Sequence, residues 1–96
     1  MGASNMKNIL KISLSFTLCV LSFNAIAGPE CTTEPRDKWK QPAEVLAEAS
    51  KEVTKMKLFK VTKGNCYELY GWNEKEEKLE IYYHPVTGKE VKRGSW

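Results

Sequence analysis

The side chains that could act as nucleophiles, general acids or metal ligands are few in this chain of 96 residues. It contains one histidine, His84, and beyond residue 27 its serines are Ser50 and Ser95. Neither serine lies in a Gly-x-Ser-x-Gly turn, and no carboxylate–histidine pair accompanies either of them. The sequence therefore lacks the residue pattern of a hydrolytic active site. A metal site would need His84 with Glu80, yet no second histidine or free cysteine follows at ligand spacing. We expect no enzymatic activity, no metal and no cofactor.

Two cysteines, Cys31 and Cys66, follow residue 27. In an oxidising compartment an even number of cysteines in a small domain predicts a disulfide. The bond would close a loop of about 35 residues, which the chain-entropy estimate makes worth roughly 3 to 4 kcal/mol. A redox-active pair, free thiols and metal ligation are the alternatives, although there is no Cys-x-x-Cys motif. We expect a structural disulfide.

The first 27 residues have the three parts of a secretory signal peptide. Lys7 and Lys11 supply positive charge, residues 12–23 form an uncharged apolar run, and residues 25–27 read Ala-Ile-Ala, a small-residue cleavage site. A membrane anchor is the alternative, but the uncharged run is at the short limit for a spanning helix. We therefore expect a periplasmic or secreted protein without membrane attachment after cleavage.

Removal of this segment changes the charge of the chain. Residues 28–96 carry 13 basic and 12 acidic side chains, a net charge of +1. They contain no block of lysine and arginine of the kind that follows a phosphate backbone, so we expect no nucleic-acid partner. We expect a monomer that binds a protein partner.

A single helix is predicted after an extended segment. Residues 28–40 contain Pro29 and Pro35 and no apolar periodicity. Pro42 suits the first position of a helix, where its missing N–H costs no hydrogen bond. Helical spacing of apolar residues then predicts an amphipathic helix that ends near Lys57. Its apolar positions are Val45, Leu46, Ala49, Val53 and Met56.

Three or four short runs of strand-forming residues follow between Leu58 and Val91. Turn signals at residues 63–65, 73–77 and 85–88 separate them, as in an antiparallel meander. The predicted fold class is α+β, with one amphipathic helix packed on a small antiparallel sheet of three to four strands and one disulfide. The predicted organisation is a signal peptide at 1–27, an extended segment at 28–40 and a domain at 41–93.

Alternation along the strands predicts two faces of the sheet. One helix can cover one face, to which we assign Phe59, Val61, Tyr67, Leu69, Leu79, Ile81, Tyr83 and Val91. The other face would be open and would carry Glu68, Tyr70, Trp72, Glu80, Tyr82 and His84. Its aromatic set is the candidate partner-binding site, namely Tyr70, Trp72, Tyr82 and His84. The alternative is that residues 28–40 fold across this face through the disulfide. Trp96 has no assigned place.

Several elements, in order, resemble the PepSY domain family. They are Trp39, the short helix, Gly-x-Cys-Tyr-Glu-x-Tyr at 64–70, Leu-Glu-Ile-Tyr at 79–82 and Pro-x-Thr-Gly-x-x-Val at 85–91. The resemblance covers about residues 31–91. Within the family, the chain is most similar to the small secreted bacterial members. It implies a helix on an antiparallel sheet. Two departures are His84, where the family usually has aspartate before the proline, and an Asp/Gly-poor loop at 73–77.

The resemblance also implies a role without catalysis. PepSY domains occur in peptidase propeptides, where they inhibit or assist the protease, and in membrane-associated redox proteins. We therefore expect a periplasmic or secreted binding module that modulates a protein partner such as a peptidase. The alternatives are an accessory domain of an envelope redox or cytochrome system, and a structural envelope protein without a specific ligand.

Overall fold

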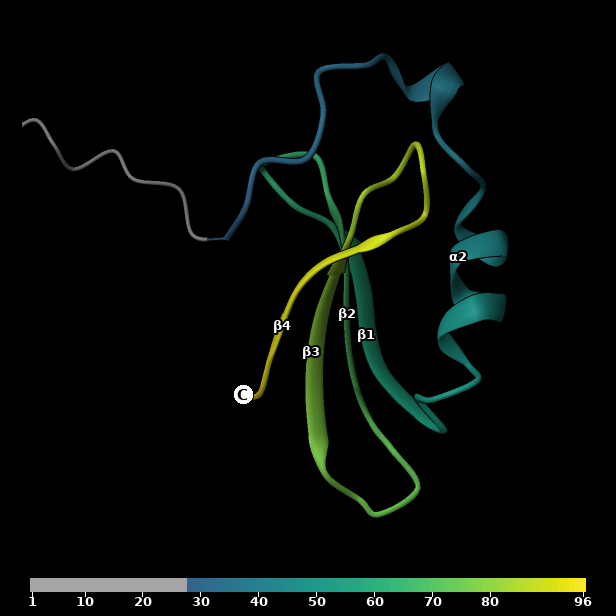
Figure 1. The fold of residues 1–96 in the computed structure, drawn as a ribbon, viewed down its shortest axis with the longest axis vertical. Helices are drawn as coiled ribbons and strands as arrows, with labels where there is room; N and C mark the ends of the chain where they lie inside the picture. The colour runs from purple at the N-terminus through teal and green to yellow at the C-terminus, as the bar shows by residue number, and fades with distance from the viewer. Residues whose placement is uncertain (1–27) are drawn as a thin grey trace, which may run out of the picture.

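A computed structural model describes residues 28–96 of the chain (Figure 1). The predicted signal peptide, residues 1–27, lies outside the described residues. The elements are η2 (Arg36–Lys38), α2 (Pro42–Ala49), β1 (Lys55–Val61), β2 (Tyr67–Trp72), β3 (Lys78–Tyr83) and β4 (Glu90–Gly94). Within the described part there is thus one short α-helix and one four-stranded antiparallel sheet, so the predicted α+β class is confirmed in these terms. No described helix is long and apolar enough to cross a membrane.

Helix α2 begins where the sequence predicted and ends earlier. Pro42 is its first residue, and the Glu44 carboxylate accepts a hydrogen bond from the Gln41 N–H at 3.2 Å. The helix ends at Ala49, so the predicted extension to Lys57 is wrong. Lys55 instead pairs with Trp72 as the first residue of β1. Long-range strand pairing therefore overrides a helical periodicity that the sequence carries through to Met56.

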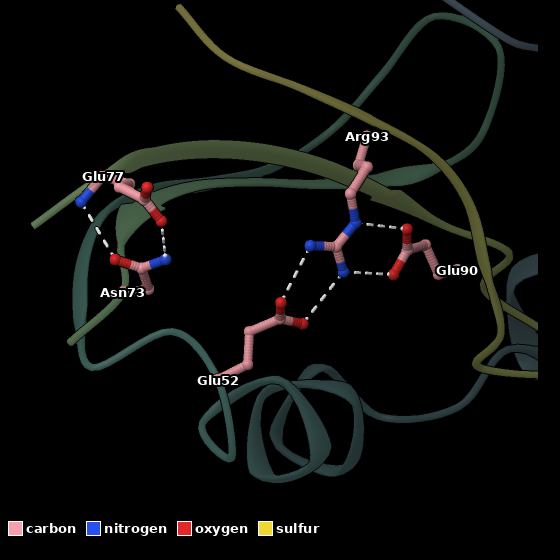
Figure 2. Close-up of polar contacts among 5 residues, drawn as sticks. All are labelled: Glu52, Asn73, Glu77, Glu90 and Arg93. Atoms are coloured by element: carbon pink, nitrogen blue, oxygen red, sulfur yellow. Dashed lines mark hydrogen bonds and ion pairs between the residues drawn. The ribbon is translucent and has the colours of Figure 1, made fainter. Parts of the chain in front are cut away.

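The sheet is a meander in which each strand pairs with its neighbour in sequence, in the order β1-β2-β3-β4. Figure 1 shows α2 beside one face of it. The β2–β3 turn is held by Asn73, whose Oδ1 accepts from the N–H groups of Lys75 and Glu77 at 2.9 Å. The Asn73 amide also donates to the Glu77 carboxylate at 2.8 Å (Figure 2). Asn73 thus stabilises the turn through its side chain, while Glu76, with a φ of +62°, takes the left-handed position.

The core lies between α2 and the sheet. Its buried members are Val45, Ala49, Val53, Tyr67, Leu69, Ile81 and Tyr83, with Trp39, Leu46, Phe59 and Leu79 packed against them. Val53 joins the core from the turn after the helix. Tyr67 is clamped between Trp39 and Phe59, with ring centroids 5.5 and 5.2 Å away. Its hydroxyl donates to the Lys40 carbonyl at 2.7 Å, so a buried polar atom is satisfied.

Two residues assigned to the helix-covered face remain exposed. Val61 pairs with Tyr67 on that face but is 37% exposed at the end of the edge strand. Val91 is 45% exposed, and its assignment to the core is wrong. The register shifts between Tyr82 and Tyr83, which pair with Lys92 and Glu90, so Val91 has no partner in the ladder. A bulge of this kind changes which side chains face the core.

Polar side chains take the place that Val91 would have filled (Figure 2). The Arg93 guanidinium donates to both oxygens of Glu52 at 2.8 and 2.9 Å, and it also donates twice to Glu90 at 2.6 Å. These hydrogen bonds hold the pKa of the Glu52 carboxyl and that of the Glu90 carboxyl below their usual values. The arrangement ties the turn after α2 to β4.

A disulfide joins the extended segment to the start of β2. Cys31 and Cys66 are bonded across 35 positions of sequence, as predicted. The Cys31 N–H also donates to the Gly64 carbonyl at 2.8 Å. At Gly64 an added Cβ would lie 2.3 Å from the Pro29 carbonyl oxygen, so only glycine permits this approach. The segment is thereby fixed against the end of the sheet at which β2 begins.

Candidate functional site

The face of the sheet that turns away from α2 carries the predicted partner-binding residues. Residues paired directly across neighbouring strands share a face, so the register defines this surface, which we call the distal face. It comprises Lys55, Leu58, Lys60, Glu68, Tyr70, Trp72, Lys78, Glu80, Tyr82 and Lys92. Three of the four predicted residues, Tyr70, Trp72 and Tyr82, are therefore brought together on one surface.

An aromatic cluster forms the centre of the distal face. Trp96 lies against Tyr70 and Trp72, with ring centroids 5.4 and 5.3 Å away and edge-on geometry at both contacts. All three rings are half-buried. Edge-to-face packing of this kind stabilises aromatic pairs beyond the burial of their area. Sequence reasoning missed Trp96 because it follows the last strand, where no alternation pattern predicts the direction of a side chain.

Lysine ammonium groups lie over these rings. Lys55 lies 5.1 Å from the Trp72 centroid, and Lys78 and Lys57 lie 5.3 and 5.9 Å from that of Trp96. Each distance falls within the range of cation–π attraction. The aromatic cluster therefore has a positively charged surround.

The distal face is less open than the sequence predicted. Tyr82 is 9% exposed and Glu68 is 3% exposed, so the expectation that both lie in the open is wrong. Gly28 lies against the Tyr82 ring, where an added Cβ would approach its atoms to 3.0–3.2 Å. The extended segment thus covers the Tyr82 end of the face, and Trp96 covers part of the Tyr70 and Trp72 rings. Half-buried aromatic surface remains around Trp72 and Trp96.

Two carboxyl groups lie beneath the aromatic residues. Glu68 pairs with Tyr82 and Glu80 pairs with Tyr70, which makes the two glutamates diagonal neighbours. Burial, and then the hydrogen bond with Glu80, raises the pKa of Glu68, while the same hydrogen bond lowers the pKa of Glu80. The pKa values of the two neighbouring carboxyls are thus shifted in opposite directions. The Tyr82 hydroxyl donates to Glu80 at 2.9 Å, and burial raises the pKa of Tyr82.

Two features of the Glu68 carboxyl agree with its raised pKa. Its Oε2 atom is buried and has no hydrogen-bond partner among the described residues. The nearest cation, the Lys60 ammonium, is 3.8 Å from Oε1, which is at the outer limit of an ion pair. A neutral Glu68 avoids an unpaired buried charge, which would be costly.

This arrangement predicts a pH dependence of stability. The pKa of Glu68 is raised on folding. Its contribution to the free energy of unfolding is therefore full below the ordinary carboxyl pKa and is lost as pH rises through the raised pKa. Glu68→Gln carries a permanently neutral amide. Relative to the wild type, we expect it to gain on the order of 1 kcal/mol in free energy of unfolding between about pH 4 and about pH 8.

Urea unfolding at the two pH values measures this gain. Glu74→Gln, at an exposed position of the β2–β3 turn, removes the same charge and is the matched control. It should change stability equally at both pH values. A Glu68→Gln variant that differs from the wild type by the same amount at both pH values would contradict a raised pKa of Glu68.

His84, the fourth predicted residue, has a different place. It follows β3 and is half-buried. Its Nδ1 accepts from the N–H groups of Val86 and Thr87 at 3.2 and 3.4 Å. The ring therefore caps the turn that reaches Gly88, whose φ is +79° and whose N–H donates to the His84 carbonyl. Histidine here supplies the acceptor that a carboxylate would otherwise provide.

A separate groove of about 620 Å³ lies on the opposite side of the sheet, between α2 and the β3–β4 turn. Its lining mixes acids such as Glu48 with lysines such as Lys40 and Lys89, and it includes no histidine, cysteine or serine. Within residues 28–96 no three His, Cys, Asp or Glu side chains gather closely enough to hold a metal ion.

The fold and the distal face define a small disulfide-linked α+β domain with a half-covered aromatic surface. The family described as Peptidase propeptide and YPEB domain matches residues 11–94, and the chain belongs to this PepSY family. Its members are propeptide-like or inhibitor-like modules without a catalytic role, and they are typically extracellular or periplasmic. No curated protein and no solved structure matches the chain.

Proposed function

We propose that this protein is a non-catalytic binding module that modulates a protein partner, such as a peptidase, through its distal face. The observation that supports this most is the aromatic cluster of Tyr70, Trp72 and Trp96, which stays half-exposed although the core lies on the other side of the sheet. Half-exposed aromatic side chains with polar surroundings are typical of the energetically dominant residues of protein interfaces.

The proposal includes the organisation and location of the chain. Residues 1–27 act as a signal peptide that directs the protein to the periplasm or the medium. Residues 28–40 then form an extended segment, and residues 41–93 form the PepSY unit to which the disulfide attaches it. His84 shapes the turn beside the binding face, and Tyr82 supports the face from below.

The state of the cysteines favours a binding role over a redox role. Cys66 is 0% exposed, so an attacking thiolate can reach the bond only at Cys31, which is half-buried. Exchange of a disulfide requires such access. A structural bond suits a module whose binding surface must keep its shape.

Capture of partners from a bacterial envelope extract tests the proposal. We expect Trp72→Ala to weaken capture of a specific partner at least about 10-fold, since loss of a central aromatic side chain commonly costs about 2 kcal/mol or more. Met56→Ala is the control, because Met56 is 51% exposed and lies opposite Gly71 on the other face. Equal capture by the wild type and the Trp72 variant, with both shown to be folded by circular dichroism, would refute the choice of face.

A further inference from the structure

The charge on the distal face is arranged in rows across the strands. Lys55, Trp72 and Lys78 lie side by side on β1, β2 and β3. Two positions earlier in β2, a second row is formed by Leu58, Tyr70, Glu80 and Gly94, and two positions earlier again a third is formed by Lys60, Glu68, Tyr82 and Lys92. The first and third rows both begin and end with lysine. Four lysines therefore stand at the corners of the aromatic centre.

The two carboxyl groups of the distal face itself are largely covered. Glu68 is buried beside the Lys60 ammonium, and Glu80 is half-buried and accepts a hydrogen bond from the Tyr82 hydroxyl. All four corner lysines are exposed. Exposed acids lie at the margins, on α2 at Glu44 and Glu48 and in the β2–β3 turn at Glu74, Glu76 and Glu77. The net charge of the chain is small, so the gathering of four lysines on one face is a property of the fold.

We propose that the distal face binds an acidic segment of a protein, in which an apolar or aromatic side chain contacts Trp72 and Trp96 while flanking carboxylates pair with the corner lysines. This inference rests on the proposed function and names the chemistry of its partner. Strand geometry separates lysines of the same row by roughly 10 to 14 Å and the two rows by roughly 13 Å. Carboxylates about four residues apart in an extended chain span a similar distance.

An anionic membrane surface fits the same charge less well. Interfacial binding requires apolar side chains that reach into the lipid. The Trp72 and Trp96 rings are half-buried, and lysine ammonium groups lie over them. A protein segment can bring its own side chain to such a surface.

Fluorescence anisotropy with three labelled nonapeptides tests the inference on the oxidised, exported protein. Each peptide has a central phenylalanine, flanked on both sides by glutamate, glutamine or lysine. We expect the glutamate peptide to bind most tightly, at least about 10-fold more tightly than the other two, and to weaken as salt is added because exposed charges are screened. Trp72→Ala should weaken binding of this peptide.

Charge reversal identifies the surface. Lys55→Glu with Lys78→Glu should weaken binding of the glutamate peptide at least about 10-fold, since close opposite charges across an interface contribute this much or more. Lys38→Glu with Lys89→Glu makes the same change of net charge at exposed positions away from the distal face, and we expect an effect below about 2-fold.

The outcomes separate this inference from the proposed function. In one outcome the glutamine or lysine peptide binds as tightly as the glutamate peptide, with Trp72→Ala still weakening that binding. In that case the partner is not acidic, but the choice of the distal face as the binding surface is supported. Equal loss in both charge-reversed variants, absence of binding by all three peptides, or tighter binding to phosphatidylglycerol vesicles would each overturn the inference. The proposed function itself fails if capture of a protein partner is insensitive to Trp72→Ala.

Discussion

Replacing both disulfide cysteines, as Cys31→Ser with Cys66→Ser, is expected to lower the free energy of unfolding by about 3 to 4 kcal/mol. The bond spans 35 positions, so its loss restores much conformational freedom to the unfolded chain. A domain of this size has a small core and typically a stability of only about 5 kcal/mol. The variant should therefore be marginally folded, and urea unfolding at neutral pH measures the difference.

Loss of the disulfide should also loosen the segment that covers the distal face. The disulfide fixes the extended segment, and Gly28 of that segment lies against Tyr82. Without the bond, hydrogen exchange should increase in residues 28–35 before it increases in β2 and β3. The control is the wild type treated with reductant, which should reach the stability of the serine variant. Equal stability of the oxidised wild type and the variant would show that the bond does not support the fold.

Leu69→Ala is expected to lower the free energy of unfolding by about 2 to 5 kcal/mol. Leu69 is 1% exposed and belongs to the core under α2, where its removal leaves a cavity that the short helix cannot fill. Leu58→Ala deletes the same atoms at a position that is 43% exposed on the neighbouring strand. We expect a loss below about 1 kcal/mol there, because much of this side chain already meets water.

Urea unfolding of the two leucine variants gives a matched comparison. The chemical change is identical, so the difference between them reports burial alone. Similar losses at both positions would mean that the sheet buries its two faces equally. The distal face would then be a second core, and a role for it in partner binding would lose its basis.

Local signals predicted the sheet well. The turns at residues 63–65, 73–77 and 85–88 divide four strands that pair in sequence order. Alternation correctly assigned Leu69 and Ile81 to the core, because side chains on successive strand positions point to opposite faces. The pairing of Cys31 with Cys66 also followed from the sequence, since the two cysteines beyond residue 27 allow one bond.

The errors occur where distant parts of the chain compete. Residues 50–57 fit a helical pattern, yet Lys55 and Met56 gain strand pairing with β2 that no local signal reveals. The bulge that exposes Val91 depends on the alignment of β3 with β4. Neither register nor bulge is encoded in the alternation of one strand.

The residues of the distal face were predicted, whereas its cover by the extended segment was predicted only as an alternative and the contribution of Trp96 was not predicted. Tyr70, Trp72 and Tyr82 follow from alternation, but Trp96 and Gly28 reach the face from segments without periodicity. The burial of Glu68 could not be predicted either, because alternation gives the direction of a side chain and not what lies over it. The raised pKa of Glu68 follows from that burial.

The central claim is that the distal face binds a protein partner. The most direct measurement is a titration of the isotope-labelled protein with its captured partner, followed by the amide and indole N–H signals in NMR spectra. We predict that the largest shifts fall at Leu58, Tyr70, Trp72 and Trp96. Shifts confined to α2 and to the groove beside Lys40 and Lys89 would contradict the claim.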